Sequence, residues 1–140
     1  MPPRYWVAVG PKESWEVSLK HQVWGLNAHG RAPYYFWEVS KGDLLLFYVT
    51  MPISGVIGYG ETTEKFEGGK PIWPAEVKGK KAIWPLRIRF QIRLLIPKES
   101  WAQGGVVSVD LKKRVQGGFQ HVPALIANEL LNQLGLVRTA

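Results

Sequence analysis

The chain has 140 residues, of which 46% are hydrophobic and 21% charged, a composition typical of a folded domain and not of a disordered chain. Eighteen Lys and Arg residues against eleven Asp and Glu residues give a formal charge of +7, which favours polyanionic partners such as nucleic acids. Cysteine is absent, so disulfide bonds, thiolate catalysis and Cys-based zinc sites are excluded, and no apolar run reaches the ~20 residues that span a bilayer.

The N-terminal half predicts a strand, a helix and two further strands. Residues 5–9 read as a strand, and residues 11–20 predict a helix because acidic residues come early, a lysine comes late, and Trp15 and Leu19 lie four residues apart. Residues 22–33 show neither a helical nor a strand period and are expected to form a loop. The other elements expected here are a short helix or turn at 33–43 and paired strands at 44–50 and 56–65, with Gly58 and Gly60 at a bulge or close backbone approach.

The next segment predicts a long loop followed by an amphipathic strand. Residues 67–81 form the expected loop, and a loop of this length in a small domain tends to be functional. Residues 83–96 alternate between apolar and polar side chains, which predicts a strand with one face in the core. Its outer face carries Arg87, Arg89 and Arg93, and the sequence leaves open whether these arginines take part in binding.

The C-terminal segment predicts a helical turn at 108–115 and a helix at 123–135, which ends at Gly135. Strands and helices in this order predict a mixed α+β fold, one domain over residues 1–140, with a strongly curved sheet or open β-barrel and flanking helices. The first ten residues lack the features of a signal peptide, so we expect a cytoplasmic protein with no membrane association. The sequence does not specify the oligomeric state.

No motif of a known catalytic centre stands out. The three histidines, His21, His29 and His121, form no pattern with metal-ligand spacing, and neither a phosphate-binding glycine loop nor a nucleophile elbow is present. Asp occurs only at 43 and 110, and Asp43 directly follows Gly42, as a turn residue would. We therefore predict a binding module without catalytic residues, metal ligands or a cofactor.

Four segments follow one another along the chain: YWVAV at 5–9, HQVWG at 21–25, SKGDLLLFYVT at 40–50 and SGVIGYGE at 54–61. In this order they resemble an EVE domain, a family of the PUA-like superfamily that is related to YTH domains. The resemblance is strong from Tyr5 to Gly60 and loose in the C-terminal third. It implies a PUA-like fold, a curved sheet or open barrel with helices at its flanks.

The resemblance also implies a site for a modified, flipped-out base. YTH domains hold a methylated adenine in a cage of aromatic rings, and by position Trp24 and Trp73 match two of these rings. Gly25, Leu26 and Asn27 are then candidates to contact the polar edge of the base, and Tyr5 is a candidate for the border of the pocket. Flanking phosphates need cations, for which the candidates are Lys80, Lys81, Lys112, Lys113 and Arg114.

Each of these assignments has a structural alternative. Trp24 could close the core, Trp73 could anchor its loop, Asn27 could serve in a turn and Tyr5 could pack in its strand. We place Trp6, Trp15 and Trp84 in the core and leave Trp37 and Trp101 unassigned.

The predicted partner is nucleic acid with a modified base, and DNA is slightly favoured over RNA. Two other classes remain open. The same pocket could belong to a small-molecule binding protein or enzyme that takes a free nucleoside. Exposed aromatic side chains could instead dock a protein partner.

Overall fold

A computed structural model describes residues 2–115 and 118–139, and in this part of the chain one sheet holds six strands. The sheet order is β2-β5-β4-β3-β1-β6. The strands are β1 (Tyr5–Gly10), β2 (Val23–Leu26), β3 (Leu44–Val49), β4 (Gly55–Glu67), β5 (Leu86–Leu95) and β6 (Phe119–Val122). The helices are α1 (Lys12–His21), α2 (Ala32–Glu38), α3 (Pro74–Gly79), α4 (Trp101–Gly104), α5 (Val109–Lys112) and α6 (Ala124–Thr139), and a 3-10 turn η1 (Lys98–Ser100) precedes α4.

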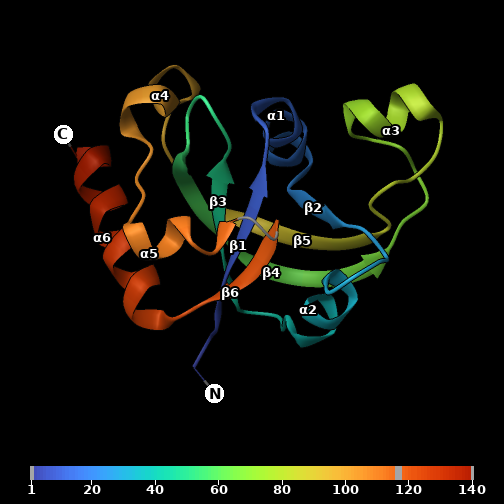
Figure 1. Ribbon diagram of the computed structural model, residues 1–140, viewed down its shortest axis with the longest axis horizontal. Coiled ribbons are helices and arrows are strands. Elements are labelled where there is room, and N and C mark those ends of the chain that lie inside the picture. The colour runs from blue at the N-terminus through green and yellow to red at the C-terminus, as the bar shows by residue number, and fades with distance from the viewer. Residues whose placement is uncertain (1, 116–117, 140) are drawn as a thin grey trace.

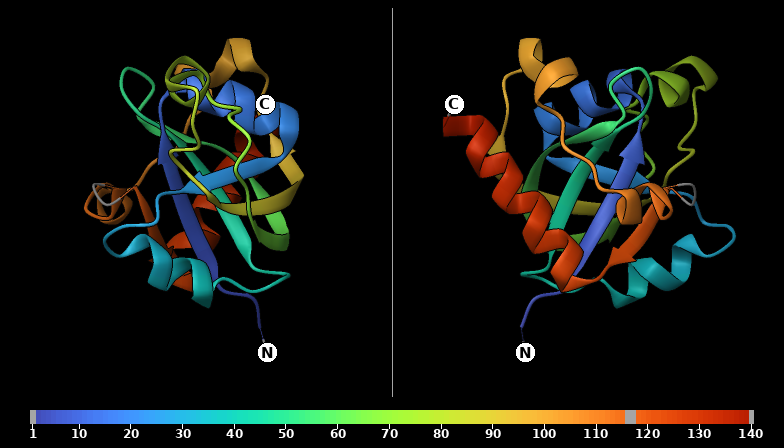
Figure 2. Two further views of the ribbon diagram at one scale, coloured as in Figure 1. Left: turned by 90° about the vertical axis from the view of Figure 1, so that its right-hand side faces the viewer. Right: turned by 60° about the vertical axis from the view of Figure 1, so that its left-hand side comes forward.

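The sheet is strongly curved, as the sequence predicts. β1 and β3 run parallel, and the other pairs are antiparallel. Pairing shifts interrupt β4 between Tyr59 and Gly60 and between Thr62 and Glu64, and such irregularities increase the local twist. A Cβ atom at Gly58 would meet the carbonyl oxygen of Leu94, so this close backbone approach requires glycine. The long strands β4 and β5 curl around one side, with helices at the flanks (Figures 1 and 2).

The core lies inside the curve of the sheet and is rich in aromatic rings. Trp6 and Trp15 are fully buried, as predicted, and each indole nitrogen donates a hydrogen bond, to Asp43 Oδ2 at 2.9 Å and to the carbonyl of Tyr48 at 2.7 Å. Asp43 also accepts from the backbone N–H groups of Arg4 and Ser40. This carboxylate therefore serves both the predicted turn and the core.

Several elements differ from the sequence prediction. Residues 23–26, expected in a loop, form β2, which pairs with β5 so that Trp24 lies opposite Ile88. Four residues are too few to show a period of two, so pairing with a longer strand decides their conformation. The expected loop at 67–81 contains α3, β6 was not predicted, and α6 continues through Gly135 to Thr139. Glycine inside a helix costs about 1 kcal/mol, which the packing of α6 offsets.

The predicted arginine face is divided. Arg89 and Arg93 are exposed and pair with Glu64 and Glu61 on the neighbouring strand. Arg87, expected in solvent, is 4% exposed and pairs with buried Glu76 at 3.2 Å. The prediction for Arg87 was wrong because α3 and its flanking segments cover the beginning of β5. No helix in the described part of the chain is long and apolar enough to span a membrane.

Candidate functional site

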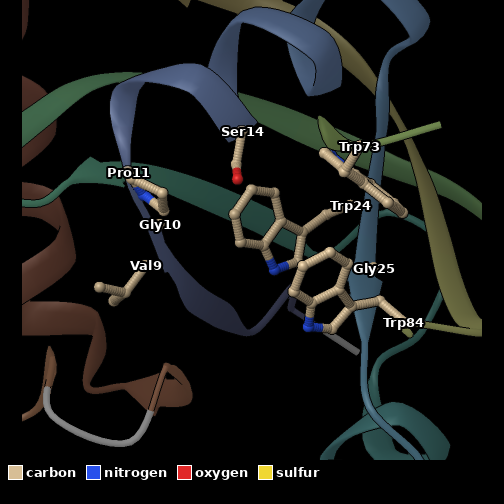
Figure 3. A pocket seen from close by; sticks show the side chains of 8 residues that line it. All are labelled: Val9, Gly10, Pro11, Ser14, Trp24, Gly25, Trp73 and Trp84. Carbon is tan, nitrogen blue, oxygen red and sulfur yellow. The ribbon is translucent and has the colours of Figure 1, made fainter. Parts of the chain in front are cut away.

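A pocket opens where β1 meets α1, beside β2 and the segments that flank α3 (Figure 3). Its lining residues are Val9, Gly10, Pro11, Ser14, Trp24, Gly25, Trp73 and Trp84. We call this cavity the tryptophan pocket. Three indoles from two distant parts of the sequence meet here because β2 pairs with the strand that follows Trp84.

The Trp24 indole is held from behind by the core. Its ring stacks on Trp15 with a centroid distance of 4.3 Å and an interplanar angle of 20°. A Cβ atom at Gly10 would lie 2.5 Å from Trp24 Cη2, so the absence of a side chain at residue 10 leaves the room that this indole occupies. Trp24 therefore presents a ring of fixed orientation to the pocket, which reduces the entropy that a stacked ligand would have to remove.

Trp73 and Trp84 form the opposite wall. Their rings meet edge to face, with centroids 5.7 Å apart and an interplanar angle of 84°. Trp73 is 2% exposed, and its indole nitrogen donates to Ser18 Oγ at 2.8 Å. Trp84, which the alternating pattern predicts to lie in the core, is only half-buried and lines the pocket. That prediction was wrong because the strand begins at Leu86, after Pro85, so Trp84 does not share its alternation.

The carboxylate of Glu76 fixes the backbone on both sides of α3. It accepts hydrogen bonds from the N–H groups of Ile72, Ile83 and Trp84 at 2.8–3.0 Å and from that of Trp73 at 3.5 Å. Burial alone would raise the pKa of Glu76. The backbone hydrogen bonds and the positive charge of Arg87 outweigh burial and hold the pKa below its usual value. Glu76 thus positions both indoles of this wall, and no sequence motif predicts this role.

Two indole N–H groups at the pocket have no hydrogen-bond partner among the described residues. These belong to Trp24 and Trp84, whereas the indole nitrogens of Trp6, Trp15, Trp73 and Trp101 all donate to protein atoms. In Figure 3 the nitrogens of Trp24 and Trp84 both lie on the side of the pocket away from Ser14. Among the described residues no buried side-chain nitrogen or oxygen lacks a partner, so these two N–H groups reach accessible space and are available to a ligand.

A second cavity shares part of this lining and continues from the pocket toward α2. We call it the side groove. It shares Val9, Trp24, Gly25 and Trp84 with the pocket and extends over Leu26, Asn27, His29, Gly30, Arg31, Ala32, Tyr35, Gly118 and Phe119. Asn27 Oδ1 accepts a hydrogen bond from the backbone N–H of His29 at 2.9 Å. The side-chain NH₂ group of Asn27 has no hydrogen-bond partner among the described residues. The groove lining contains Arg31 and no acidic residue, which favours an anion.

The structure brings together most of the predicted base-binding residues. Trp24 and Gly25 line both cavities, Trp73 lines the pocket, and Leu26 and Asn27 line the groove. Tyr5 lies elsewhere, because its hydroxyl donates to Asn128 Oδ1 on α6 at 3.1 Å and it lines neither cavity.

The five predicted phosphate-binding residues lie outside both cavities. Lys80 and Lys81 are exposed just after α3, and Lys112, Lys113 and the half-buried Arg114 belong to α5 and the residues after it. Figure 1 shows α3 and α5 on opposite sides of β1. In the described part of the chain, no group of three or more His, Asp or Glu side chains could hold a metal ion.

Comparison with known proteins gives a fold and no family. No family model and no curated protein matches the sequence. A hypothetical protein from Leishmania major has a similar structure, with a TM-score of 0.59 and 17% identity over 97% of each chain. The Mmi1 YTH domain in complex with RNA has a TM-score of 0.66 and 9% identity, over 98% of this chain and 80% of the Mmi1 chain. The YTH domain of Zygosaccharomyces rouxii MRB1 in complex with N6-methyladenosine RNA has a TM-score of 0.58 and 15% identity, over 94% of this chain and 86% of the MRB1 chain. The chain therefore has the mixed α+β, PUA-like fold of the YTH domains, as predicted.

Proposed function

We propose that this protein binds RNA and holds one methylated base in the tryptophan pocket, as an EVE-type member of the PUA-like proteins. The observation that carries the proposal is the convergence of Trp24 and Trp84, both with unpartnered indole N–H groups, on a pocket that opens into a cationic groove. The similarity to the YTH domains of Mmi1 and MRB1 supports it, since those structures contain RNA and, for MRB1, N6-methyladenosine RNA.

The chemistry of the pocket suits a flat, partly polar ligand. Stacking a base on an aromatic side chain contributes about 1–3 kcal/mol, and the available indole N–H groups can donate to ring nitrogens of the base. Burying a methyl group among the indoles adds about 0.8 kcal/mol, or roughly fourfold in affinity. The proposed sandwich uses Trp24 and Trp84, with the edge of the more buried Trp73 closing the pocket.

RNA replaces DNA as the proposed partner. The sequence resemblance slightly favoured DNA, but the nucleic acid named in the complexes of Mmi1 and MRB1 is RNA. A single strand is the simplest substrate, because an unpaired base enters a pocket without the cost of opening a duplex. Lys80, Lys81, Lys112, Lys113 and Arg114 remain candidates for contacts with phosphates further along the strand.

The test compares two nine-nucleotide RNAs that differ only in N6-methylation of the central adenine, by isothermal titration calorimetry. We expect the methylated RNA to bind about fourfold more tightly or better, and Trp84→Ala to abolish this preference while lowering affinity for both RNAs. Leu125→Ala is the control, because Leu125 is an 84% exposed side chain of α6 outside both cavities, so its removal should leave both affinities and their ratio unchanged. Equal binding of both RNAs by the unaltered protein, with no effect of Trp84→Ala, would refute the proposal.

A further inference from the structure

Helix α2 exposes two large aromatic side chains. Tyr34 and Trp37 are each 73% exposed, and residues three apart on a helix lie side by side. Other side chains attach α2 to the protein, because Phe36 is buried in the core and Tyr35 packs against the core. Tyr34 and Trp37 contribute little to that packing, and exposed aromatic clusters commonly mark binding surfaces.

This exposed face adjoins the side groove. Ala32 and Tyr35 line the groove from α2, as does Arg31 directly before the helix. Arg31 lies three residues from Tyr34, and Tyr34 lies three residues from Trp37, so these side chains follow one another around the helix surface. Arg31 therefore belongs both to the groove and to the row of side chains that carries the exposed rings.

The charges near this row of side chains favour an anionic partner. Arg31 has no carboxylate partner among the described residues, unlike Arg89 and Arg93 on the sheet. The Lys65 ammonium lies 5.8 Å from the centroid of the Trp37 ring and donates to the carbonyls of Phe36 and Trp37. Glu38, the acidic residue of α2, is paired with Arg4 at 3.5 Å, which offsets its charge. Flat rings interleaved with cations are the surface that single-stranded nucleic acid prefers.

We propose that α2 is a second contact for the same RNA strand. The nucleotide next to the pocketed base crosses the side groove, where Arg31 neutralises a phosphate, and a following base stacks on Tyr34 or Trp37. The inference rests on the proposed function, because it extends the RNA from the tryptophan pocket. It assigns a role to Trp37, for which the sequence alone gave none.

The experiment uses two probes, free N6-methyladenosine and the nine-nucleotide RNA with this base at its centre, with calorimetry as the readout. The double variant Tyr34→Ala/Trp37→Ala should weaken binding of the RNA about fivefold or more and leave the affinity for the nucleoside unchanged. Trp37→Phe, which keeps a flat ring, should retain most of the affinity. Leu125→Ala removes an 84% exposed side chain from α6 and serves as the control for loss of exposed apolar surface.

The outcomes separate this inference from the function on which it rests. If Trp84→Ala weakens both probes while the double variant binds the RNA like the unaltered protein, the contact at α2 is refuted and the pocket stands. If Trp84→Ala affects neither probe but the double variant weakens the RNA, the pocket fails and the α2 contact stands. Loss of a protein partner by the double variant with RNA binding intact would assign α2 to protein docking and overturn the inference.

Discussion

At the scale of single residues, the pocket depends on glycine, because a side chain at certain positions would collide with the indoles. Gly25 lies in β2 directly below the wall formed by Trp73 and Trp84. A Cβ atom at this residue would lie 2.6 Å from Trp73 Cη2 and 2.7 Å from Trp84 Cβ, well inside normal contact distance. The two indoles can therefore close over β2 only because residue 25 is glycine.

Gly25→Ala should displace Trp73 and Trp84 and so weaken RNA binding. Overpacking of this kind costs about 1–3 kcal/mol, which we expect as a lower free energy of unfolding in urea, together with loss of the preference for the methylated base. Gly69→Ala is the control, because a Cβ atom there would meet nothing within 4 Å. Unchanged selectivity in Gly25→Ala would show that the indoles can shift without loss of the binding site.

The sequence predicted the residues of this site unevenly. Trp24, Gly25 and Trp73 were predicted from the resemblance to EVE and YTH domains, and the structure places all three at one pocket. Trp84 was missed because its apolar ring seemed to continue the alternation of the strand that follows. Glu76 was missed because a glutamate in a predicted loop gives no sign that five donors converge on it. Such convergence is a tertiary property, which local pattern cannot reveal.

At the scale of elements, α3 and β5 are joined by a buried ion pair. Arg87 from β5 contacts the Glu76 carboxylate and also donates to the carbonyl of Lys70. Because this pair holds the segments that carry Trp73 and Trp84, the stability of the α3 region and the shape of the pocket depend on the same carboxylate.

Glu76→Gln should destabilise the protein by about 3–5 kcal/mol, since it leaves the Arg87 charge buried without a counterion. The pKa of Glu76 in the folded chain lies below its usual 4.5, so its stabilising contribution is complete above pH 4.5 and is lost as the pH falls through the folded pKa. Urea unfolding between pH 3 and pH 7 should therefore show a smaller loss of stability with acid in Glu76→Gln than in the unaltered protein. Glu67→Gln, at an exposed position, should leave the pH profile unchanged.

Elements with strong local patterns were predicted well, and those defined by pairing were not. β1, α1, β3, β4 and the beginning of α6 follow from periodicity and from glycine and proline positions. β2 and β6 have four residues each, and each pairs along one side with a longer strand, so partners distant in sequence determine them. The fold class was nevertheless predicted, because the order of the longer strands restricts how a sheet can close.

At the scale of the whole molecule, the excess of positive charge is distributed unequally. Arg4, Arg87, Arg89, Arg93 and Lys98 pair with carboxylates, whereas Arg31 and the predicted phosphate-binding residues do not pair in the described structure. Cations without a carboxylate partner thus occur at the groove and at the two short helices α3 and α5, whereas no charged side chain of the described residues lines the tryptophan pocket.

Binding of the nine-nucleotide RNA should weaken steeply as salt rises, with a slope of about −0.7 in log K against log salt for each phosphate neutralised. Arg31→Gln should reduce the magnitude of that slope by about 0.7, because one phosphate contact is lost. Arg93→Gln should leave the slope unchanged, since Arg93 is paired with Glu61 and lines neither cavity. A slope near zero for the unaltered protein would instead mean that it neutralises no phosphate of the RNA, as expected of a pocket made for a free nucleoside.

β2 is an edge strand of the sheet, and this position links ligand binding to local unfolding. This strand pairs with β5 along one side, and it carries Trp24, one of the two proposed faces of the sandwich. Edge strands open more readily than interior strands, and opening of β2 would remove the Trp24 ring from the pocket. A bound base therefore stabilises the closed strand by RT ln(1 + L/Kd), where L is the free ligand concentration, so slowed hydrogen exchange of the β2 amides would report occupancy of the pocket directly.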